Sequence, residues 1–154
     1  MMSSKAKYAV RAAVVLARDE AAQVWIATSD IAERENIPRK FLEAILVEMR
    51  DTGLVESRRG PSGGHRLGRS AANISVADIL RCIDGPLALT PCASRTQFGP
   101  CKDCEAMATC PLKGVLQQAR DAMAQVLENC SLLSLVSSRP QGRKPAARRS
   151  QAAK

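Results

Sequence analysis

The segment LVESRRGPSGGHRL, residues 54–67 of this 154-residue chain, decides the fold that we expect. Residues 54–57 and 65–67 have the composition of two short strands, and the basic, glycine-rich residues between them suit a flexible turn. Glycines permit positive φ and close backbone approach, and arginine side chains can enter a DNA minor groove. The pattern therefore predicts a β-wing, with a basic hairpin that meets only solvent as the alternative.

Six residues of this hairpin are candidate DNA contacts. The arginines supply positive charge, the glycines allow close approach, and the histidine is the single one in the chain. Inside a wing, this histidine is expected to contact DNA or solvent rather than a metal. The candidates are Arg58, Arg59, Gly63, Gly64, His65 and Arg66.

Two helices are expected before the wing, after a linker with strand character at residues 24–26. Thr28 or Ser29 is a good N-cap for the first helix. Asn36 suits the turn, and Pro38 fits the first position of the second helix because its missing N–H needs no partner there. Apolar residues recur along the second helix at i, i+1, i+4, i+5 and i+8, namely Phe41, Leu42, Ile45, Leu46 and Met49.

The apolar stripe leaves Arg39, Lys40 and Glu43 exposed near the start of the second helix. A recognition helix contacts base edges with its N-terminal residues, where Lys or Arg suits guanine and a carboxylate can accept from cytosine. Many helical hairpins look alike, so two helices alone are weak evidence. Together with the wing, they predict a winged helix-turn-helix that binds a double-stranded DNA operator.

Two further helices complete the predicted domain. Ser3 or Ser4 can cap a first helix that runs to about residue 18, and Asn73 or Ser75 can cap a helix over about residues 76–83. Cys82 lies on the latter and is expected to be a small buried hydrophobic residue. The expected fold class is thus mainly α, a winged helix-turn-helix with a small β-wing and a long C-terminal dimerisation helix.

Residues 92–110, CASRTQFGPCKDCEAMATC, form a second unusual stretch, which we call the cysteine segment. It holds four of the six cysteines, Cys92, Cys101, Cys104 and Cys110, among residues that favour turns. Thiolates bind soft metals, with iron–sulfur clusters and zinc as the usual occupants. We expect an Fe–S cluster of two or four irons; zinc, and thiol or disulfide chemistry, are the alternatives.

After Pro111 the apolar positions repeat at spacings of 4, 3, 4, 3, 4 and 3. This predicts a helix whose apolar seam is about 33 Å long at 1.5 Å per residue, longer than a small winged domain can cover. We therefore expect a homodimer on a roughly palindromic operator, rather than packing within one chain. The seam consists of Leu112, Leu116, Ala119, Met123, Val126, Cys130 and Leu133.

Composition and sequence pattern argue against a membrane protein, a secreted protein and an enzyme. Six of the basic residues behind the net charge of +8 follow Ser138 and leave the rest near +2, so the global charge is weak evidence for nucleic-acid binding. No apolar run approaches a membrane span, and residues 12–17 are too short for a signal peptide. We expect a cytoplasmic, reduced protein, which favours metal over disulfides. A thiol oxidoreductase using Cys101 and Cys104 lacks the βαβ pattern it needs, so no enzyme is expected.

The order of helix pair, wing RRGPSGGHRLGR, cysteine segment and long helix resembles the Rrf-two family of bacterial transcription regulators, over about Ser3 to Leu133. The resemblance implies a dimeric winged-helix regulator, controlled in many members by a cluster bound to three loop cysteines. We accordingly expect a DNA-binding domain over residues 1–86, a sensor loop over 87–111, a dimerisation helix over 112–138 and a disordered basic tail over 139–154.

By the same resemblance, Cys92, Cys104 and Cys110 take the places of the family's three ligands, and Cys101 is additional. Some members of the family have a histidine shortly after the third cysteine, where this chain has a lysine. Others use an acidic residue just before the tyrosine of the first helix, and here too a lysine stands. A protonated lysine is not a ligand, so Cys101 is expected to supply the missing thiolate.

Overall fold

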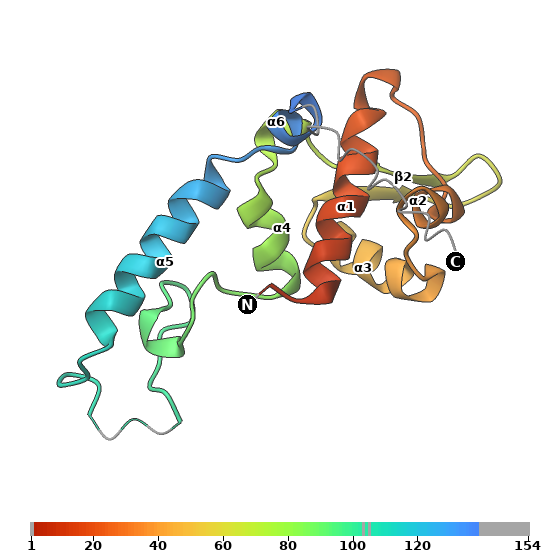
Figure 1. Ribbon diagram of the computed structural model, residues 1–154. Helices are drawn as coiled ribbons and strands as arrows, with labels where there is room; N and C mark the ends of the chain where they lie inside the picture. The colour runs from red at the N-terminus through yellow and green to blue at the C-terminus, as the bar shows by residue number, and fades with distance from the viewer. Residues whose placement is uncertain (1, 103, 105, 139–154) are drawn as a thin grey trace, which may run out of the picture.

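The computed structural model describes residues 2–102, 104 and 106–138, and the predicted basic tail lies outside them. The mainly helical fold with a small two-stranded sheet is confirmed (Figure 1). The helices are α1 (Ser4–Arg18), α2 (Thr28–Glu35), α3 (Arg39–Asp51), α4 (Val76–Ile83), α5 (Lys113–Glu128) and α6 (Leu132–Ser137). The strands are β1 (Val55–Arg58) and β2 (Gly64–Leu67), and the 3-10 turns are η1 (Glu20–Ala22), η2 (Ala71–Asn73) and η3 (Pro91–Ala93).

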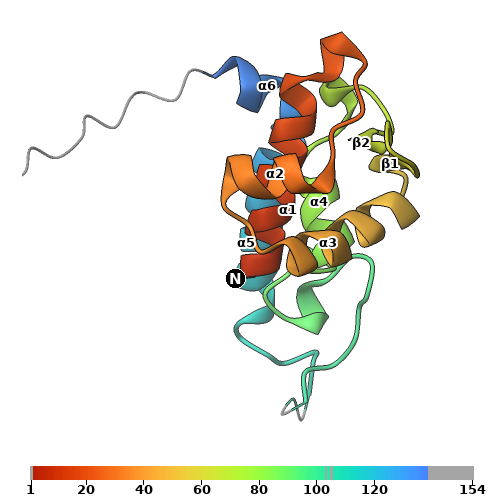
Figure 2. The ribbon, with the colours of Figure 1, turned by 90° about the vertical axis from the view of Figure 1, so that its right-hand side faces the viewer.

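Helix α1 is the centre of the winged domain, with α2, α3, α4, α6 and β2 packed around it (Figures 1 and 2). Its alanines at positions 6, 9, 12 and 13 have no exposed surface. Since alanine adds only a methyl group, the surrounding helices approach α1 closely, and a larger side chain there would cost about 1–3 kcal/mol of stability. The large core residues come from the neighbours and include Ile31, Leu42, Ile45, Leu46, Met49, Leu54, Ile79 and Leu132.

Two of the four predicted helix starts are confirmed, and two are displaced by one residue. The side chain of Ser3 accepts from the Ala6 N–H, and Ser75 forms a capping box with Asp78. In contrast, Ala27 and Pro38 occupy the N-cap positions of α2 and α3. The hydroxyl of Thr28 bonds to His65 at 2.9 Å instead of capping α2.

The wing is attached to the linker that precedes α2. Strands β1 and β2 pair antiparallel from Val55↔Leu67 to Arg58↔Gly64. Ile26 and His65 then exchange two backbone hydrogen bonds, of 2.9 and 2.8 Å, which adds an isolated bridge to β2. The strand character predicted for residues 24–26 is confirmed at this one residue, and the hairpin thereby joins the body of the domain.

The prediction of one continuous helix over residues 112–138 is wrong. Helix α5 ends at Glu128, and α6 starts at Leu132 after a Ser131 N-cap. At the break, Val76 N–H donates to the Cys130 carbonyl and Leu132 N–H donates to the Ile74 carbonyl, each at 2.9 Å. These bonds to the segment before α4 replace helical ones, and the burial of Leu132 in the core fixes the bend.

The fold keeps the two regions of interest apart. The wing and α3 lie at one end of the molecule, and the cysteine segment lies at the other, at the foot of α5 (Figures 1 and 2). Among the described residues, no helix is long and apolar enough to cross a membrane.

Candidate DNA interface and cysteine segment

The N-terminal end of α3 presents polar side chains, as predicted from its apolar stripe. Arg39, Lys40 and Glu43 are all exposed, while the stripe positions from Leu42 to Met49 are buried. Arg39 Nε donates to Glu43 Oε1 at 3.0 Å across one helical turn. This pair is highly exposed, so water or DNA can compete for both partners at little cost in stability.

One member of the predicted stripe, Phe41, is not buried. Its side chain is 40% exposed, and its ring meets Tyr8 of α1 edge-on at a centroid distance of 5.7 Å. Phe41, the first position of the stripe, lies at the margin of the buried face, where a large ring reaches over the domain edge. The apolar stripe is therefore buried from Leu42 onward.

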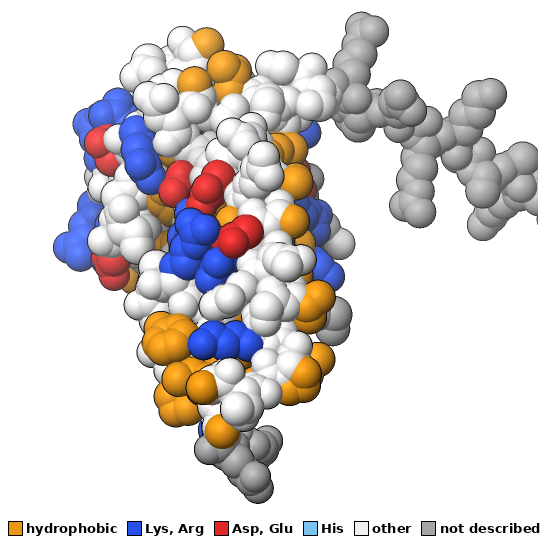
Figure 3. Space-filling model, turned by 90° about the vertical axis from the view of Figure 1, so that its left-hand side faces the viewer, with side chains coloured by type: hydrophobic (Ala, Val, Ile, Leu, Met, Phe, Trp, Pro, Cys, Tyr) orange, Lys and Arg blue, Asp and Glu red, His pale blue; other side chains and the backbone are white. Residues whose placement is uncertain are grey.

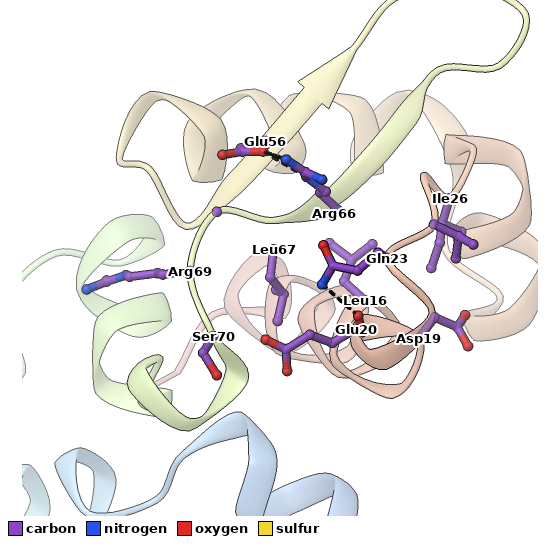
Figure 4. Close-up of a pocket in the computed structure, with 12 residues that line it drawn as sticks. Leu16, Asp19, Glu20, Gln23, Ile26, Glu56, Arg66, Leu67, Arg69 and Ser70 are labelled. Carbon is purple, nitrogen blue, oxygen red and sulfur yellow. Dashed lines mark hydrogen bonds and ion pairs between the residues drawn. The ribbon is translucent and has the colours of Figure 1, made fainter.

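The wing arginines have different surroundings. Arg66 donates from Nε to Glu56 Oε2 at 2.8 Å across the two strands, beside a polar pocket at the base of the wing (Figure 4). The guanidinium carbons of Arg66 and Arg58 also lie over the Trp25 ring, 4.5 and 6.0 Å from its centroid. Arg59, in the turn, is exposed and has no ion pair within the described part of the chain.

The His65 side chain connects the wing to the start of α2. Its Nδ1 bonds to Ser57 Oγ at 2.8 Å and its Nε2 to Thr28 Oγ1 at 2.9 Å. Burial, together with the positive charge of Arg50, lowers the pKa of His65 below its ordinary value. The neutral ring thus joins β1, β2 and the start of α2, and both of its nitrogens are already used.

Gly63 and Gly64 also have internal roles. A Cβ on Gly63 would meet the Arg58 carbonyl oxygen at 2.1 Å, and one on Gly64 would meet the Ile26 carbonyl oxygen at 2.4 Å. Gly64 further has a φ of +147°. These glycines close the hairpin and let it lie against the linker, which is a packing requirement independent of DNA.

Two cysteines of the cysteine segment lie together. Cys92 is buried on η3, and its Sγ is 3.7 Å from the Sγ of Cys101, which donates to it. The Thr90 hydroxyl lies 3.3 Å from Cys92 Sγ and lowers the pKa of that thiol. The same thiol–thiol hydrogen bond raises the pKa of Cys101. Cys92 is therefore the more acidic of the pair, and Cys101 holds its proton.

The other two predicted ligands are not assembled with this pair. The Cys104 N–H donates to the Cys101 carbonyl at 3.2 Å, and the Cys110 carbonyl accepts from Lys113 at the start of α5 at 3.3 Å. Over the residues that the structure describes, no three His, Cys, Asp or Glu side chains gather in a group that could hold a metal ion.

The two remaining cysteines lie away from the segment. Cys82 packs at the edge of the core, where its Sγ is 3.3 Å from Thr52 Oγ1 and 3.5 Å from the Glu48 carbonyl oxygen. Cys130 is half-buried at the break between α5 and α6. Cys82 thus packs against the core as expected, but it is half-buried rather than buried.

The cysteine segment is tied to α5 by a largely covered arginine side chain. Arg120, whose side chain is 12% exposed, donates to the Ala93 carbonyl at 2.5 Å, next to Cys92. Asp121 bonds to Arg120 and to Arg95 of the segment, and Arg120 lowers the pKa of this carboxyl. A direct hydrogen bond therefore connects the backbone next to Cys92 to α5.

Helix α5 presents its apolar seam to solvent. No residue of α5 is buried, and Leu112, Val126 and Leu133 of the seam are 59%, 69% and 49% exposed. Figure 3 views this side and shows hydrophobic side chains gathered toward the end near the cysteine segment. Such an exposed apolar surface marks an interaction site.

Sequence reasoning missed several residues of these sites. Trp25, Glu56 and Thr28 hold the wing, and Arg120 holds the cysteine segment. Trp25 could have been noticed in the sequence, because it is the single tryptophan of a chain with only 3% aromatic residues and it precedes an arginine-rich hairpin. Arg120 gave no such signal, because a basic residue on an exposed helix is common.

Comparison with known proteins agrees with this geometry. The family model Rrf2, described as an iron-dependent transcriptional regulator, matches residues 2–138. An rrf2-like HTH-type transcriptional regulator of Rhodobacter capsulatus is 40% identical over 121 residues, which are 77% of this chain and 80% of that protein. The HTH-type transcriptional regulator IscR of Escherichia coli is 32% identical over 136 residues, 88% of this chain and 79% of IscR.

A solved structure shows the same architecture. CymR, the global cysteine regulator of B. subtilis, superposes with a TM-score of 0.73 and 27% identity, covering 91% of this chain and 98% of CymR. These relatives are transcriptional regulators and not enzymes, which rules out the thiol oxidoreductase alternative. The chain belongs to the Rrf2 family and is a DNA-binding, winged-helix transcriptional regulator.

Proposed function

We propose that this regulator reads DNA with the start of α3 and the tip of the wing. Arg39, Lys40 and Glu43 are exposed at the helix end that a recognition helix directs to base edges. Among the described residues, Arg59 is the exposed wing arginine that has neither an ion pair nor an aromatic ring contact, so it is the one to enter a minor groove. Arg58, His65 and Arg66 bond to or stack on neighbouring protein groups instead.

Substitutions at two positions test this interface. Arg59→Ala should weaken binding to a duplex selected from a random library by roughly 1–3 kcal/mol, the range for a specific contact. Glu43→Ala should instead change the preferred sequence, since a carboxylate accepts from cytosine N4. Glu33→Ala, an exposed acid on α2, is the control. Unaltered affinity and selectivity in both variants would show that DNA binds elsewhere.

We further propose that operator affinity responds to an Fe–S cluster bound by Cys92, Cys101, Cys104 and Cys110. The observation that carries this proposal is the thiol pair at the foot of α5, in which two soft donors already lie 3.7 Å apart. Cys104 and Cys110 follow on a stretch whose described residues lie outside any helix or strand, so they can close around the pair. Four thiolates are a donor set that suits such a cluster, and when bound it supplies redox-active iron.

The rest of the response is carried by residues of this chain. Ordering of the segment would pull on the Ala93 carbonyl, to which Arg120 of α5 is bonded. Arg81 of α4 pairs with Glu128 of α5, and α4 packs against α1 and α3. A shift of α5 is thereby passed to the recognition helix. In a dimer formed by the exposed α5 seams, the same shift changes the spacing of the two recognition helices.

Metal and sulfide analysis of single cysteine variants tests the cluster. The protein purified without oxygen should contain iron and acid-labile sulfide, with absorbance in the visible region. Loss of Cys92, Cys104 or Cys110 should abolish that absorbance, whereas loss of Cys101 should leave a more labile cluster. Cys82→Ala and Cys130→Ala are the controls and should retain it. Zinc alone, or no metal, would refute the cluster.

A second candidate sensor is a disulfide between Cys92 and Cys101, favoured by the same 3.7 Å separation. With hydrogen peroxide as oxidant, the Cys92 thiolate attacks one oxygen, breaks the O–O bond, and becomes a sulfenic acid as the other oxygen leaves as water. Cys101 then attacks the sulfenic sulfur, the S–S bond forms, and the second oxygen leaves as water. Two thiols are oxidised and one peroxide is reduced.

Peptide mapping separates this candidate from the cluster. Peroxide added to the metal-free protein should link the peptides that contain Cys92 and Cys101, and Cys101→Ser should remove the link. Cys104→Ser is the matched control, because the Cys92–Cys101 pair does not involve its thiol. A different pairing, or six free thiols after treatment, would count against this switch.

A further inference from the structure

The single tryptophan of the chain lies where the wing meets the body of the domain. Trp25 is half-buried in the linker before α2, and its ring lies under the guanidinium groups of Arg66 on β2 and Arg58 on β1. Arg66 is bonded in turn to Glu56 on the opposite strand. We call Trp25, Glu56, Arg58 and Arg66 the tryptophan clamp. Tryptophan is the aromatic side chain that attracts cations most strongly.

The clamp is one of three connections that hold the wing to the linker and the start of α2. Ile26 exchanges two backbone hydrogen bonds with His65, and Thr28 bonds to the His65 ring. Trp25 itself contacts one side chain from each strand. A two-stranded hairpin is marginal by itself in water, so such contacts decide where the wing points.

The clamp also separates the wing arginines by role. Arg66 has a carboxylate at 2.8 Å and an aromatic ring at 4.5 Å, so its charge is already engaged inside the protein. Arg58 shares that ring at 6.0 Å. Arg59, between Arg58 and the glycine turn, has no ion pair over the described ranges and faces solvent.

We propose that Trp25 is a positioning residue for DNA binding: it holds the strand arginines of the wing and so presents Arg59 to DNA. Arg66 belongs to the clamp and does not contact phosphate. Holding the hairpin in place before DNA arrives removes part of the ordering cost of binding. The inference rests on the proposed DNA interface, and Arg59→Ala tests that interface separately.

Affinity measurements on the full chain test the positioning role. With a duplex selected from a random library by the unaltered protein, Trp25→Ala should bind about threefold to thirtyfold more weakly, as expected for one or two exposed cation–π contacts. Trp25→Phe keeps an aromatic ring and should recover most of the loss. Val24→Ala alters the exposed neighbour on the same linker and should bind like the unaltered protein. Equal affinities for Trp25→Ala and Val24→Ala would overturn the proposal.

Salt dependence distinguishes positioning from contact. Removal of one positive charge that neutralises DNA phosphates should make the slope of log K against log salt shallower by about one. An arginine in the minor groove is such a charge, so Arg59→Ala should show this change if the proposed interface is right, whereas Trp25→Ala and Arg66→Ala should keep the original slope. A shallower slope for Arg66→Ala would mean that Arg66 leaves the clamp to bind phosphate, and the inference would be refuted.

Intrinsic fluorescence gives a readout independent of affinity, because Trp25 is the only tryptophan. Arg66→Ala should shift the emission of the free protein, and Arg81→Ala, far from the ring on α4, should not. Adding the selected duplex to the unaltered protein should leave the emission maximum in place, since the clamp stays closed on DNA. A shift equal to that of Arg66→Ala would show that DNA opens the clamp.

Discussion

At the scale of single residues, His65 makes the stability of this fold depend on pH. Its pKa is lowered in the folded protein by burial and by Arg50, while in the unfolded chain it has its ordinary value of about 6.5. Between those two values the unfolded state binds more protons, so stability rises with pH in that window. The contribution of the neutral His65 ring to stability is fully present above about pH 6.5 and is lost as the pH falls toward the pKa of His65 in the folded protein.

Replacing His65 with glutamine should remove this dependence. Glutamine can keep a hydrogen bond to Thr28 but carries no proton to titrate, and losing the bond to Ser57 should cost about 1 kcal/mol at pH 7.5. Below pH 6.5 the unaltered protein should lose stability faster than the variant. Urea unfolding of both proteins at several pH values measures this difference. A gap that stays constant with pH would mean that folding does not shift the pKa of His65.

Residue types predicted the exposed polar end of α3 better than they predicted the contacts within the wing. The exposure of Arg39, Lys40 and Glu43 follows from the helical period alone. The partners of His65 and Arg66 come from other elements, so no local pattern could have indicated them. Two of the glycines that indicated the wing have packing roles, since Gly63 lies against Arg58 within the hairpin and Gly64 lies against Ile26.

At the scale of elements, the heptad spacing predicted α5 correctly but placed its end too far along the chain. Periodicity continues through Cys130 and Leu133, yet the backbone bonds from Val76 and Leu132 interrupt the helix. Tertiary hydrogen bonds thus override a local pattern. The break directs Leu132 into the core and leaves α5 as a helix with no buried residue of its own.

This exposed helix predicts the behaviour of a charged variant. Val126→Glu would place a carboxylate in the apolar seam of both partners of a two-fold dimer, and should weaken association by at least about 2 kcal/mol. Gln118→Glu adds the same charge at another exposed position of α5 outside the seam and is the control. Light scattering should show a shift to monomers only for Val126→Glu. A monomeric unaltered protein at micromolar concentration would mean that the seam binds something else.

At the scale of the whole molecule, the cysteine segment lies at one end and the wing with α3 at the other, and α5 connects them (Figure 1). The cysteine segment reaches α5 through Arg120 and Asp121, and α5 reaches the winged domain through α4 and through the Arg81–Glu128 pair. No single stretch of sequence contains this route. The four cysteines could be identified as a candidate site from their spacing, but their connection to α3 needed the fold.

Arg120→Gln should therefore separate sensing from DNA binding. Glutamine is shorter and uncharged, so it loses both the bond to the Ala93 carbonyl and the pair with Asp121, while every cysteine stays. The variant should still take up iron and sulfide and show visible absorbance, but its affinity for the selected duplex should change less between the loaded and the metal-free forms. Arg95→Gln removes an exposed partner of the same Asp121 and should respond like the unaltered protein, because Arg120 still holds the segment. Affinities measured without oxygen, before and after a chelator, give the comparison. If Arg120→Gln kept the full response, the signal would have to leave the cysteine segment by another path than Ala93.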